Sequence, residues 1–255
     1  MAASFLASPL VKHKIVIPED QKIKVTGQTS GIKTLLTIAI DGPAGAGKST
    51  VARCVAHALG YLYIDTGAMY RAATWLVMQE RINIQDLEAV VNLVGGANVE
   101  LKPANTSSGG RARVFVNGQE VTNEIRSQDV TRLVSPVSAI PGVRTHLVEV
   151  QKQMAEHGGI VMDGRDIGTV VLPNANIKIF LTANPRTRAA RRLKELQELG
   201  QKADLETLVK EIEERDRQDS TRAVAPLRQA YDAILINTDT MSKDEVVDRI
   251  LNLCR

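Results

Sequence analysis

The feature that most constrains this chain is the glycine-rich octapeptide Gly-Pro-Ala-Gly-Ala-Gly-Lys-Ser at residues 42–49, which follows the apolar run 35–40. A buried strand that leads into such a turn, followed by a helix opening with Lys-Ser-Thr, is typical of a P-loop. Glycines let successive backbone N–H groups surround a polyphosphate, and the positive end of the following helix points at the same anion. We therefore expect a nucleoside triphosphate site in which Lys48 reaches the outer phosphates and Ser49 can hold Mg²⁺. Its residues are Gly42, Pro43, Ala44, Gly45, Ala46, Gly47, Lys48, Ser49 and Thr50.

Composition narrows the remaining possibilities. A chain of 255 residues is long enough for one α/β domain with insertions or tails. Aromatic residues make up only 3% and the net charge is only +3, which argues against a nucleic-acid-binding surface. No apolar stretch approaches the roughly 20 residues of a membrane span, and the two cysteines lack metal-ligand spacing. We expect a cytoplasmic monomer with neither nucleic acid nor membrane as a partner.

Residues 1–34 differ in character from the rest of the chain. The apolar runs 15–17 and 23–25 could form short strands, but residues 27–31 are typical of a linker. The first ten residues lack the basic segment of a secretory signal, whereas the scarcity of acids before Glu19 leaves an organelle transit peptide open. We expect a flexible N-terminal extension over 1–34 and an ordered domain over 35–255.

Beyond residue 35, patterns typical of strands and helices alternate. We predict strands over 61–64, 159–162, 177–181 and 234–237, helices over 50–59, 70–80, 84–93 and 143–157, a helical pair over 186–217 broken near Gly200, and a last helix capped by Ser242. This alternation predicts an α/β fold, a three-layer parallel sheet with helices on both faces. Ligands then lie beyond the carboxyl ends of the strands, where Gly42, Asp65 and Asp163 fall.

The stretch from residue 95 to residue 122 does not follow this alternation of strand and helix patterns. Two short segments rich in apolar residues, 99–101 and 114–116, precede the turn dipeptide Asn117-Gly118. This pattern predicts a small antiparallel sheet, inserted at the rim of the main one.

Two segments that follow predicted strands could hold a second ligand beside the triphosphate. The first is Asp-Thr-Gly-Ala-Met-Tyr-Arg at 65–71, although a helix start capped by Asp65 or Thr66, with Arg71 in solvent, also explains it. The second is Asp-Gly-Arg-Asp-Ile-Gly-Thr-Val-Val at 163–171, in which Asp163 is placed to hold Mg²⁺. A tight turn with no ligand is the alternative for this second segment.

Seven arginines lie between residues 186 and 222. An exposed helix with salt bridges would explain them, because acids are almost as numerous there. Arginines on a mobile segment could instead close over the site, neutralise a transferring phosphoryl group and exclude water. The seven are Arg186, Arg188, Arg191, Arg192, Arg215, Arg217 and Arg222.

Four blocks in order, residues 40–50, 65–71, 163–171, and 214–216 with 222–227, resemble the bacterial-type cytidylate kinase family, and the likeness runs from about Thr37 to the C-terminus. The resemblance implies direct, in-line transfer of the γ-phosphate of Mg²⁺-bound ATP to CMP or dCMP inside a closed lid. It also implies that 95–135 is a monophosphate-binding insertion and that 186–222 is the lid.

The resemblance further implies roles for individual side chains at the matching positions. Acceptor-phosphate contacts would be Arg71, Arg165 and Arg222, cytosine contacts Ser135, Arg144 and Asp166, and sugar contacts Arg215 and Asp219, with Thr66 and Tyr70 completing the acceptor site. The catalytic set would be Lys48, Asp163, Arg165, Arg188 and Arg192, with Arg188 and Arg192 in the lid over ATP. Ser49 and Asp163 would hold the metal.

Several alternatives stay open at this point. A kinase for UMP, AMP or shikimate is the alternative among enzymes, and a nucleotide-dependent switch is the alternative outside them. The sequence lacks the Asn-Lys-x-Asp element that reads guanine in GTPase switches. The N-terminal extension could be a linker remnant of a fused enzyme, a targeting segment or a disordered tail.

Overall fold

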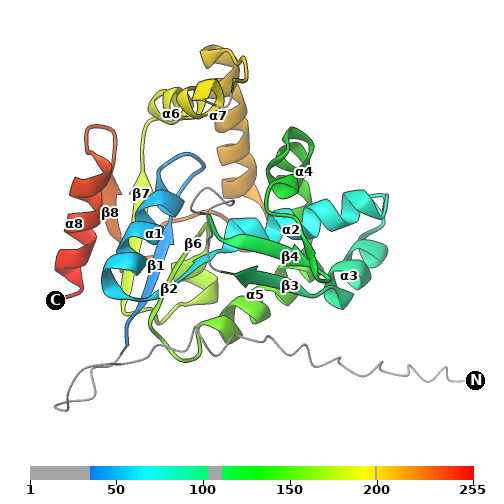
Figure 1. Ribbon diagram of the computed structural model, residues 1–255, viewed down its shortest axis with the longest axis horizontal. Helices are drawn as coiled ribbons and strands as arrows, with labels where there is room; N and C mark the ends of the chain where they lie inside the picture. Colours follow the sequence, from blue (N-terminus) through cyan, green and yellow to red (C-terminus); the bar gives the residue numbers. More distant parts are fainter. Residues whose placement is uncertain (1–34, 103–110, 199) are drawn as a thin grey trace, which may run out of the picture.

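The computed structural model describes residues 35–102, 111–198 and 200–255 (Figure 1). Its centre is a five-stranded parallel sheet with the strand order β2-β6-β1-β7-β8. The strands are β1 (Thr37–Asp41), β2 (Leu62–Asp65), β6 (Ile160–Gly164), β7 (Ile177–Thr182) and β8 (Ile234–Asn237). The predicted α/β fold is therefore confirmed, whereas the two short strands expected before residue 35 lie outside the described residues.

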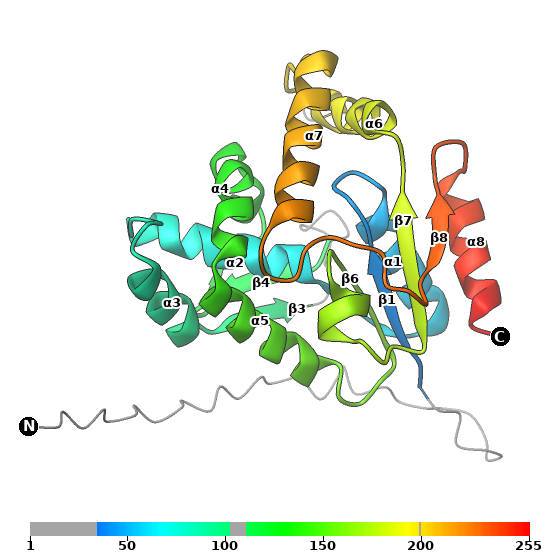
Figure 2. The ribbon, with the colours of Figure 1, turned by 180° about the vertical axis from the view of Figure 1, so that it is seen from behind.

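Helices cover both faces of this sheet (Figures 1 and 2). Helices α1 (Lys48–Leu59) and α8 (Lys243–Leu253) pack on one face, and α2 (Thr66–Gln79) and α5 (Pro141–Met154) pack on the other. Along β1, Ile38 and Ile40 face the α1 side while Ala39 faces the α2 side, and all three are fully buried. Burial on both faces explains why the strand is an unbroken apolar run in the sequence.

A second, antiparallel sheet of three strands packs against α2. It consists of β3 (Val99–Lys102), β4 (Arg113–Val116) and β5 (Gln119–Glu120). The predicted hairpin turn is confirmed, because Asn117 and Gly118 both have positive φ angles, 50° and 83°. Helix α3 (Leu87–Gly96) precedes this sheet, and residues 103–110 lie outside the described part of the chain.

A 3₁₀ turn, Glu124–Arg126, and helix α4 (Gln128–Ala139) connect the small sheet to α5. The sequence pattern did not predict α4. Pro136 lies inside this helix, and an internal proline normally ends a helix because it lacks an N–H group.

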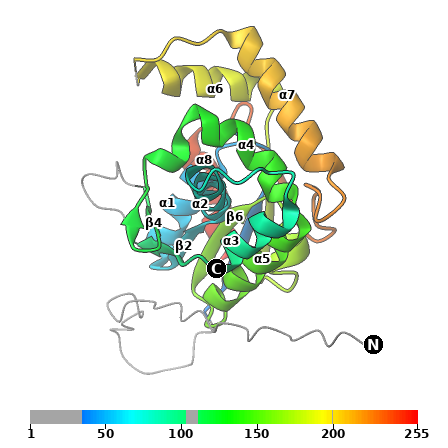
Figure 3. The same cartoon turned by 90° about the vertical axis from the view of Figure 1, so that its right-hand side faces the viewer.

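Helices α6 (Pro185–Glu198) and α7 (Leu205–Thr221) form a hairpin beyond the carboxyl ends of the strands (Figures 1 and 3). They share a small core of their own, made by Ala189, Leu196, Leu208 and Ile212. The helical pair broken near Gly200 is thus confirmed. The chain then runs from α7 to β8 across the side of the molecule that faces the viewer in Figure 2.

Side-chain caps explain where several helices differ from the prediction. Helix α2 begins at Thr66 rather than at residue 70, because Asp65 Oδ1 accepts a hydrogen bond from Ala68 N at 2.9 Å. Helix α3 begins at Leu87 rather than at residue 84, because Asp86 caps it in the same way. The predicted cap of the last helix is confirmed, since Ser242 and Glu245 form a reciprocal capping box. In the described part of the chain, none of the helices has the length and apolarity that a membrane crossing requires.

Candidate active site

The glycine-rich loop turns tightly between β1 and α1. Gly42 has a φ of 147°, and a Cβ atom there would lie 2.0 Å from the carbonyl oxygen of Leu181. Gly47 caps α1 with a φ of 88° and offers no side-chain cap, so the first N–H groups of the helix remain available to an anion. The ammonium group of Lys48 is buried and donates to Pro43 O at 2.8 Å, which folds this side chain back along the loop.

Asp163 lies at the carboxyl end of β6, next to the start of α1. Its Oδ2 accepts from Ser49 Oγ and its Oδ1 from Tyr63 OH, both at 2.9 Å. Burial raises the pKa of the Asp163 carboxyl, with a further contribution from Asp65, and burial lowers the pKa of the Lys48 ammonium, with a further contribution from Arg165. A cation beside Asp163 and a polyphosphate beside Lys48 would each relieve a charge that the fold has removed from water.

The loop opens into a pocket whose lining carries seven cationic and four acidic side chains. The structure places Ala44, Gly45, Lys48 and Ser49 in this lining, with the other predicted loop residues in the turn and helix behind them. All ten residues that the sequence assigned to the acceptor also line it, namely Thr66, Tyr70, Arg71, Ser135, Arg144, Arg165, Asp166, Arg215, Asp219 and Arg222. They come from α2, α4, α5, the end of β6, and α7 with the chain after it, so tertiary folding brings these distant segments together.

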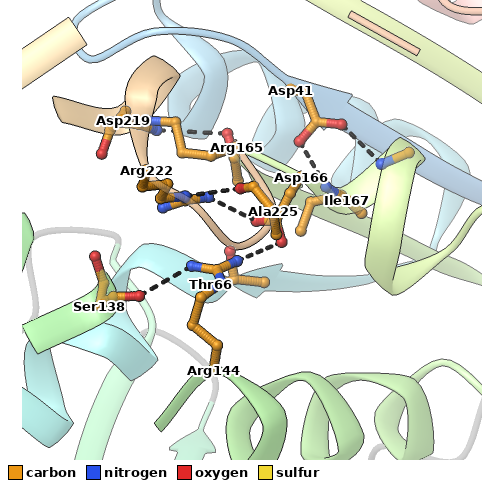
Figure 4. Close-up of polar contacts among 12 residues, drawn as sticks. Asp41, Thr66, Ser138, Arg144, Arg165, Asp166, Ile167, Asp219, Arg222 and Ala225 are labelled. Carbon is orange, nitrogen blue, oxygen red and sulfur yellow. Dashed lines mark hydrogen bonds and ion pairs between the residues drawn. The ribbon is translucent and has the colours of Figure 1, made fainter. Parts of the chain in front are cut away.

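Asp166 forms one end of the pocket and is bound by two arginines (Figure 4). Arg144 Nη2 donates to its Oδ2, and Arg222 Nη2 lies 3.5 Å from its Oδ1. Arg144 is only 2% exposed, donates to the carbonyl oxygen of Ser138 at 3.2 Å, and lies over the ring of Tyr70 at 5.2 Å from the ring centre. Donors and acceptors are therefore fixed side by side at this end.

The backbone that carries Asp166 is fixed from β1. After Asp166 the chain makes a π-helical turn, Ile167–Val171, in place of the tight turn considered from the sequence. Both carboxylate oxygens of Asp41, the last residue of β1, accept from this turn, from Ile167 N at 2.8 Å and from Gly168 N at 2.7 Å (Figure 4). Burial raises the pKa of Asp41 to about 6, although these two hydrogen bonds act in the opposite direction.

Contacts at the end of α7 and just after it fix two more arginines of the pocket, Arg165 and Arg222. Arg165 Nε donates to Asp219 Oδ2 at 2.8 Å, which joins the end of β6 to α7. Arg222 Nε donates to Ala225 O at 2.7 Å, inside a turn in which Ala225 has a φ of 50°. The α6–α7 hairpin is thus tied to the pocket through residues that also line it (Figure 4).

Arg71 and Arg215 face the same part of the pocket without a carboxylate partner within 4.0 Å among the described residues. Arg71 Nη1 donates to Thr131 Oγ1 at 2.9 Å and to Ile125 O at 3.3 Å. Burial lowers the pKa of Arg71 to about 9, with contributions from neighbouring arginines, and burial lowers that of Arg215 to about 10. Uncompensated guanidinium groups at this density favour a bound anion.

Two residues of the predicted catalytic set do not line the pocket. Arg188 is buried beneath the loop, where it donates to Ala183 O, Ala44 O and Asp216 Oδ2 at 2.9, 3.0 and 2.6 Å. Arg192 is half exposed on α6 and pairs with Glu195. Their predicted contacts with ATP remain predictions.

Sequence reasoning missed several residues that shape the site. Arg126 and Ser138 line the pocket, Tyr63 donates to Asp163, and Asp41 fixes the turn that follows Asp166. Asp65 also lines the pocket, and its place between a strand and a helix had already pointed to a site at 65–71. For Arg126 the local sequence carries no such signal, because its position depends on the packing of the insertion against α2.

Comparisons with known proteins agree with this geometry. A family model described as cytidylate kinase matches residues 38–255. The chain is 54% identical over 218 residues to a cytidylate kinase of Geobacillus sp. (strain WCH70), covering 86% of this chain and 96% of that protein. It is 53% identical over 218 residues to a bifunctional pantoate ligase/cytidylate kinase of Synechococcus sp. (strain JA-2-3B'a(2-13)), covering 86% of this chain and 40% of that protein. A solved shikimate kinase from Bacteroides thetaiotaomicron is similar at 16% identity, with 86% of this chain and 98% of that chain covered and a TM-score of 0.43, too distant to bear on function.

Proposed function

The chain belongs to the cytidylate kinase family and phosphorylates CMP or dCMP with ATP, and we propose that this pocket holds donor and acceptor together for direct transfer. One observation carries this proposal. The loop residue Lys48 and the base-reading candidates Asp166 and Arg144 line the same cavity, together with five further arginines.

The triphosphate of ATP lies along the loop in this proposal. Backbone N–H groups at the start of α1 and the Lys48 ammonium bind its phosphates. Ser49 and Asp163 fit a magnesium ion, because their oxygens lie 2.9 Å apart and Mg²⁺ prefers oxygen ligands. Bound there with ATP, the ion would neutralise charge on the phosphates. In the described residues no group of three or more metal-binding side chains occurs, so phosphate and water oxygens would complete its shell.

The cytosine ring lies against Asp166, Arg144 and Ser135. Cytosine offers an exocyclic amine, which suits the Asp166 carboxylate, and neighbouring acceptors, which suit the Arg144 guanidinium. Uracil presents an acceptor oxygen where cytosine has its amine. This oxygen and the Asp166 carboxylate would face each other without a hydrogen-bond donor between them. A mismatch of this kind costs about 1–3 kcal/mol for each group left unpaired, which explains the discrimination we expect.

The transfer itself needs position and charge rather than a protein nucleophile. A phosphate oxygen of CMP attacks the γ-phosphorus, the bond from that phosphorus to the oxygen bridging to the β-phosphate breaks, and ADP leaves. The acceptor phosphate is largely dianionic at neutral pH, so no side chain must remove a proton. Arg71, Arg165 and Arg222 neutralise the meeting charges, and closure of the α6–α7 hairpin excludes water.

An acceptor panel tests this proposal. Initial rates of ADP formation would be measured with CMP, dCMP, UMP, AMP and shikimate, and with no acceptor. We expect CMP and dCMP to give the highest kcat/KM and the acceptor-free rate to be negligible. Equal rates with UMP would contradict the proposed base contacts, and fast hydrolysis without an acceptor would contradict closure around both substrates.

We also propose that the enzyme works in the cytoplasm as a monomer. The predicted donor and acceptor residues meet within a single copy of the chain, so the proposed site needs no second copy, and the free thiols Cys54 and Cys254 suit a reducing compartment. Sedimentation at micromolar concentration, with and without both nucleotides, would measure the assembly state; a dimer of higher specific activity would contradict the proposal.

A further inference from the structure

Arg126 ends the 3₁₀ turn between the small sheet and α4, and the turn is held firmly against α2. The side chain of Ile125, the residue before it, is completely buried among residues of α2 and the small sheet. The carbonyl oxygen of Ile125 accepts from Arg71 Nη1 at 3.3 Å. The backbone at Arg126 is therefore fixed beside the guanidinium of Arg71, and the Arg126 side chain lines the pocket there.

The guanidinium of Arg126 is incompletely satisfied by the protein. Its Nη2 lies 3.5 Å from Asp65 Oδ2, at the outer limit of a hydrogen bond, and the other oxygen of Asp65 is occupied in capping α2. Its Nε is buried and has no hydrogen-bond partner. A buried donor without a partner is costly, and in a pocket lined by polar groups a ligand can supply the missing acceptor.

The charges around Arg126 indicate what kind of ligand that is. Arg126 and Arg215 both contribute to the lowering of the Arg71 pKa, after burial itself. Neither Arg71 nor Arg215 has an ion pair within 4.0 Å among the described residues, and Asp65 is the single carboxylate that pairs with Arg126 there. Three guanidinium groups that repel one another are best explained by an anion that several of them share.

We infer that Arg126 binds the phosphate group of the acceptor nucleotide, together with Arg71. The inference rests on the proposed function, because it places the acceptor in this pocket. It assigns the acceptor rather than ATP, since Arg126 is fixed beside Arg71, and Arg71 is one of the predicted contacts of the acceptor phosphate. The phosphate replaces the long contact with Asp65 and gives the Arg126 Nε its acceptor.

Binding measurements on the full chain test this role. The dissociation constant of CMP would be measured by calorimetry, and that of cytidine, which lacks the phosphate, by NMR titration. We expect Arg126→Met to weaken CMP binding by about 10-fold to 100-fold, the usual range for a lost charge-assisted hydrogen bond, and to leave cytidine binding unchanged. Arg126→Lys, which keeps the charge but not the fork of donors, would recover part of the loss.

Arg132→Met is the matched control, because this substitution removes the same charge from a side chain that is 76% exposed on α4 and pairs with Asp129. CMP binding by this variant would stay unchanged. An equal loss of CMP and cytidine binding in Arg126→Met would show that Arg126 only shapes the pocket, and unchanged CMP binding would show that it does not touch the phosphate; either result overturns the inference. Failure of the proposed function is distinguishable, because the unmodified enzyme would then neither bind CMP nor phosphorylate it.

Discussion

Two buried aspartates at the site have different partners and so behave differently. Asp166 is surrounded by the guanidinium groups of Arg144 and Arg222, whereas Asp41 accepts only backbone N–H groups. The oxygens of Asp166 can also accept a hydrogen bond from a ligand, beside the two guanidinium groups. For Asp41 the effect of burial exceeds that of its two backbone hydrogen bonds, so its pKa is raised.

The Asp166→Asn substitution tests base reading at the residue scale. Asparagine keeps the size of the side chain but replaces one acceptor oxygen with a donor, which opposes the amine of cytosine. We expect kcat/KM for CMP to fall by about 10-fold to 100-fold while KM for ATP changes little. Steady-state kinetics with CMP and UMP measure this, and an unchanged ratio of the two specificity constants would count against cytosine contact at Asp166.

Asp41 predicts a particular dependence of stability on pH. Burial raises its pKa from 3.8 to about 6, so between these values the folded state holds a proton that the unfolded state has released. The free energy of unfolding therefore falls as pH rises from about 4 to about 6 and then levels off, by about 3 kcal/mol for this group.

The Asp41→Asn substitution should remove the part of the pH dependence of the unfolding free energy that comes from Asp41. Urea unfolding at pH 4, 5, 6 and 7 would show the gap between the two proteins narrowing as pH rises. The exposed Asp248→Asn is the control and should leave the pH profile as it is. Parallel profiles for Asp41→Asn and the unmodified protein would refute the raised pKa.

At the scale of elements, short polar signals decide where helices begin. Asp65, Asp86, Ser127, Asp204 and Ser242 each accept a hydrogen bond from a backbone N–H in the first turn of a helix. Such caps act within three residues, so they are readable in the sequence once the helix itself is recognised. Helix α4 was not recognised, because Pro136 interrupts its pattern, and Ser127 was overlooked with it.

Ser242→Ala tests the capping box of α8. We expect the free energy of unfolding to fall by about 1 kcal/mol, because the backbone N–H of Glu245 loses the Ser242 Oγ that accepts its hydrogen bond. Ser242→Asp keeps an acceptor at this position and should lose much less. Helix α8 packs on the α1 side and does not line the pocket, so kcat should be unaffected in both variants. Denaturant unfolding and steady-state rates measure both effects, and a large loss of activity in the alanine variant would be unexpected.

At the scale of the whole molecule, Arg188 joins three parts that must act together. Its guanidinium binds the loop at Ala44, the end of β7 at Ala183 and helix α7 at Asp216. The α6–α7 hairpin is therefore linked to the triphosphate loop by one buried side chain. This position differs from direct contact with ATP, and it gives Arg188 a way to couple closure of the hairpin to the loop.

Arg188→Met should weaken both the fold and the coupling. Loss of one partner of a mostly buried ion pair is expected to cost about 2–4 kcal/mol of unfolding free energy, and KM for ATP should rise as the loop loses its support. Arg186→Met is the matched control, because Arg186 is 64% exposed and its pair with Glu206 lies in solvent. Urea unfolding and the KM for ATP measure the difference between the two variants. Equal unfolding free energies and equal KM values would show that Arg188 does not couple the hairpin to the loop.

The sequence by itself determined those structural features that depend only on residues close together in the chain. The loop at 42–49 follows from glycine spacing, the strands from apolar runs and the hairpin from Asn117-Gly118, because each is set within a few residues. The resemblance to the cytidylate kinase family further indicated which blocks, far apart in the sequence, contribute to one pocket.

Only the tertiary structure decided which charges meet. Asp41 binds a turn 126 residues away, Arg165 meets Asp219 across 54 residues, and Arg126 reaches the pocket because a buried neighbour fixes its turn. The spacing of residues within a short segment of sequence does not indicate such distant partners. They are selected by the shared packing of helices and sheet, which brings together the carboxyl ends of strands far apart in the chain.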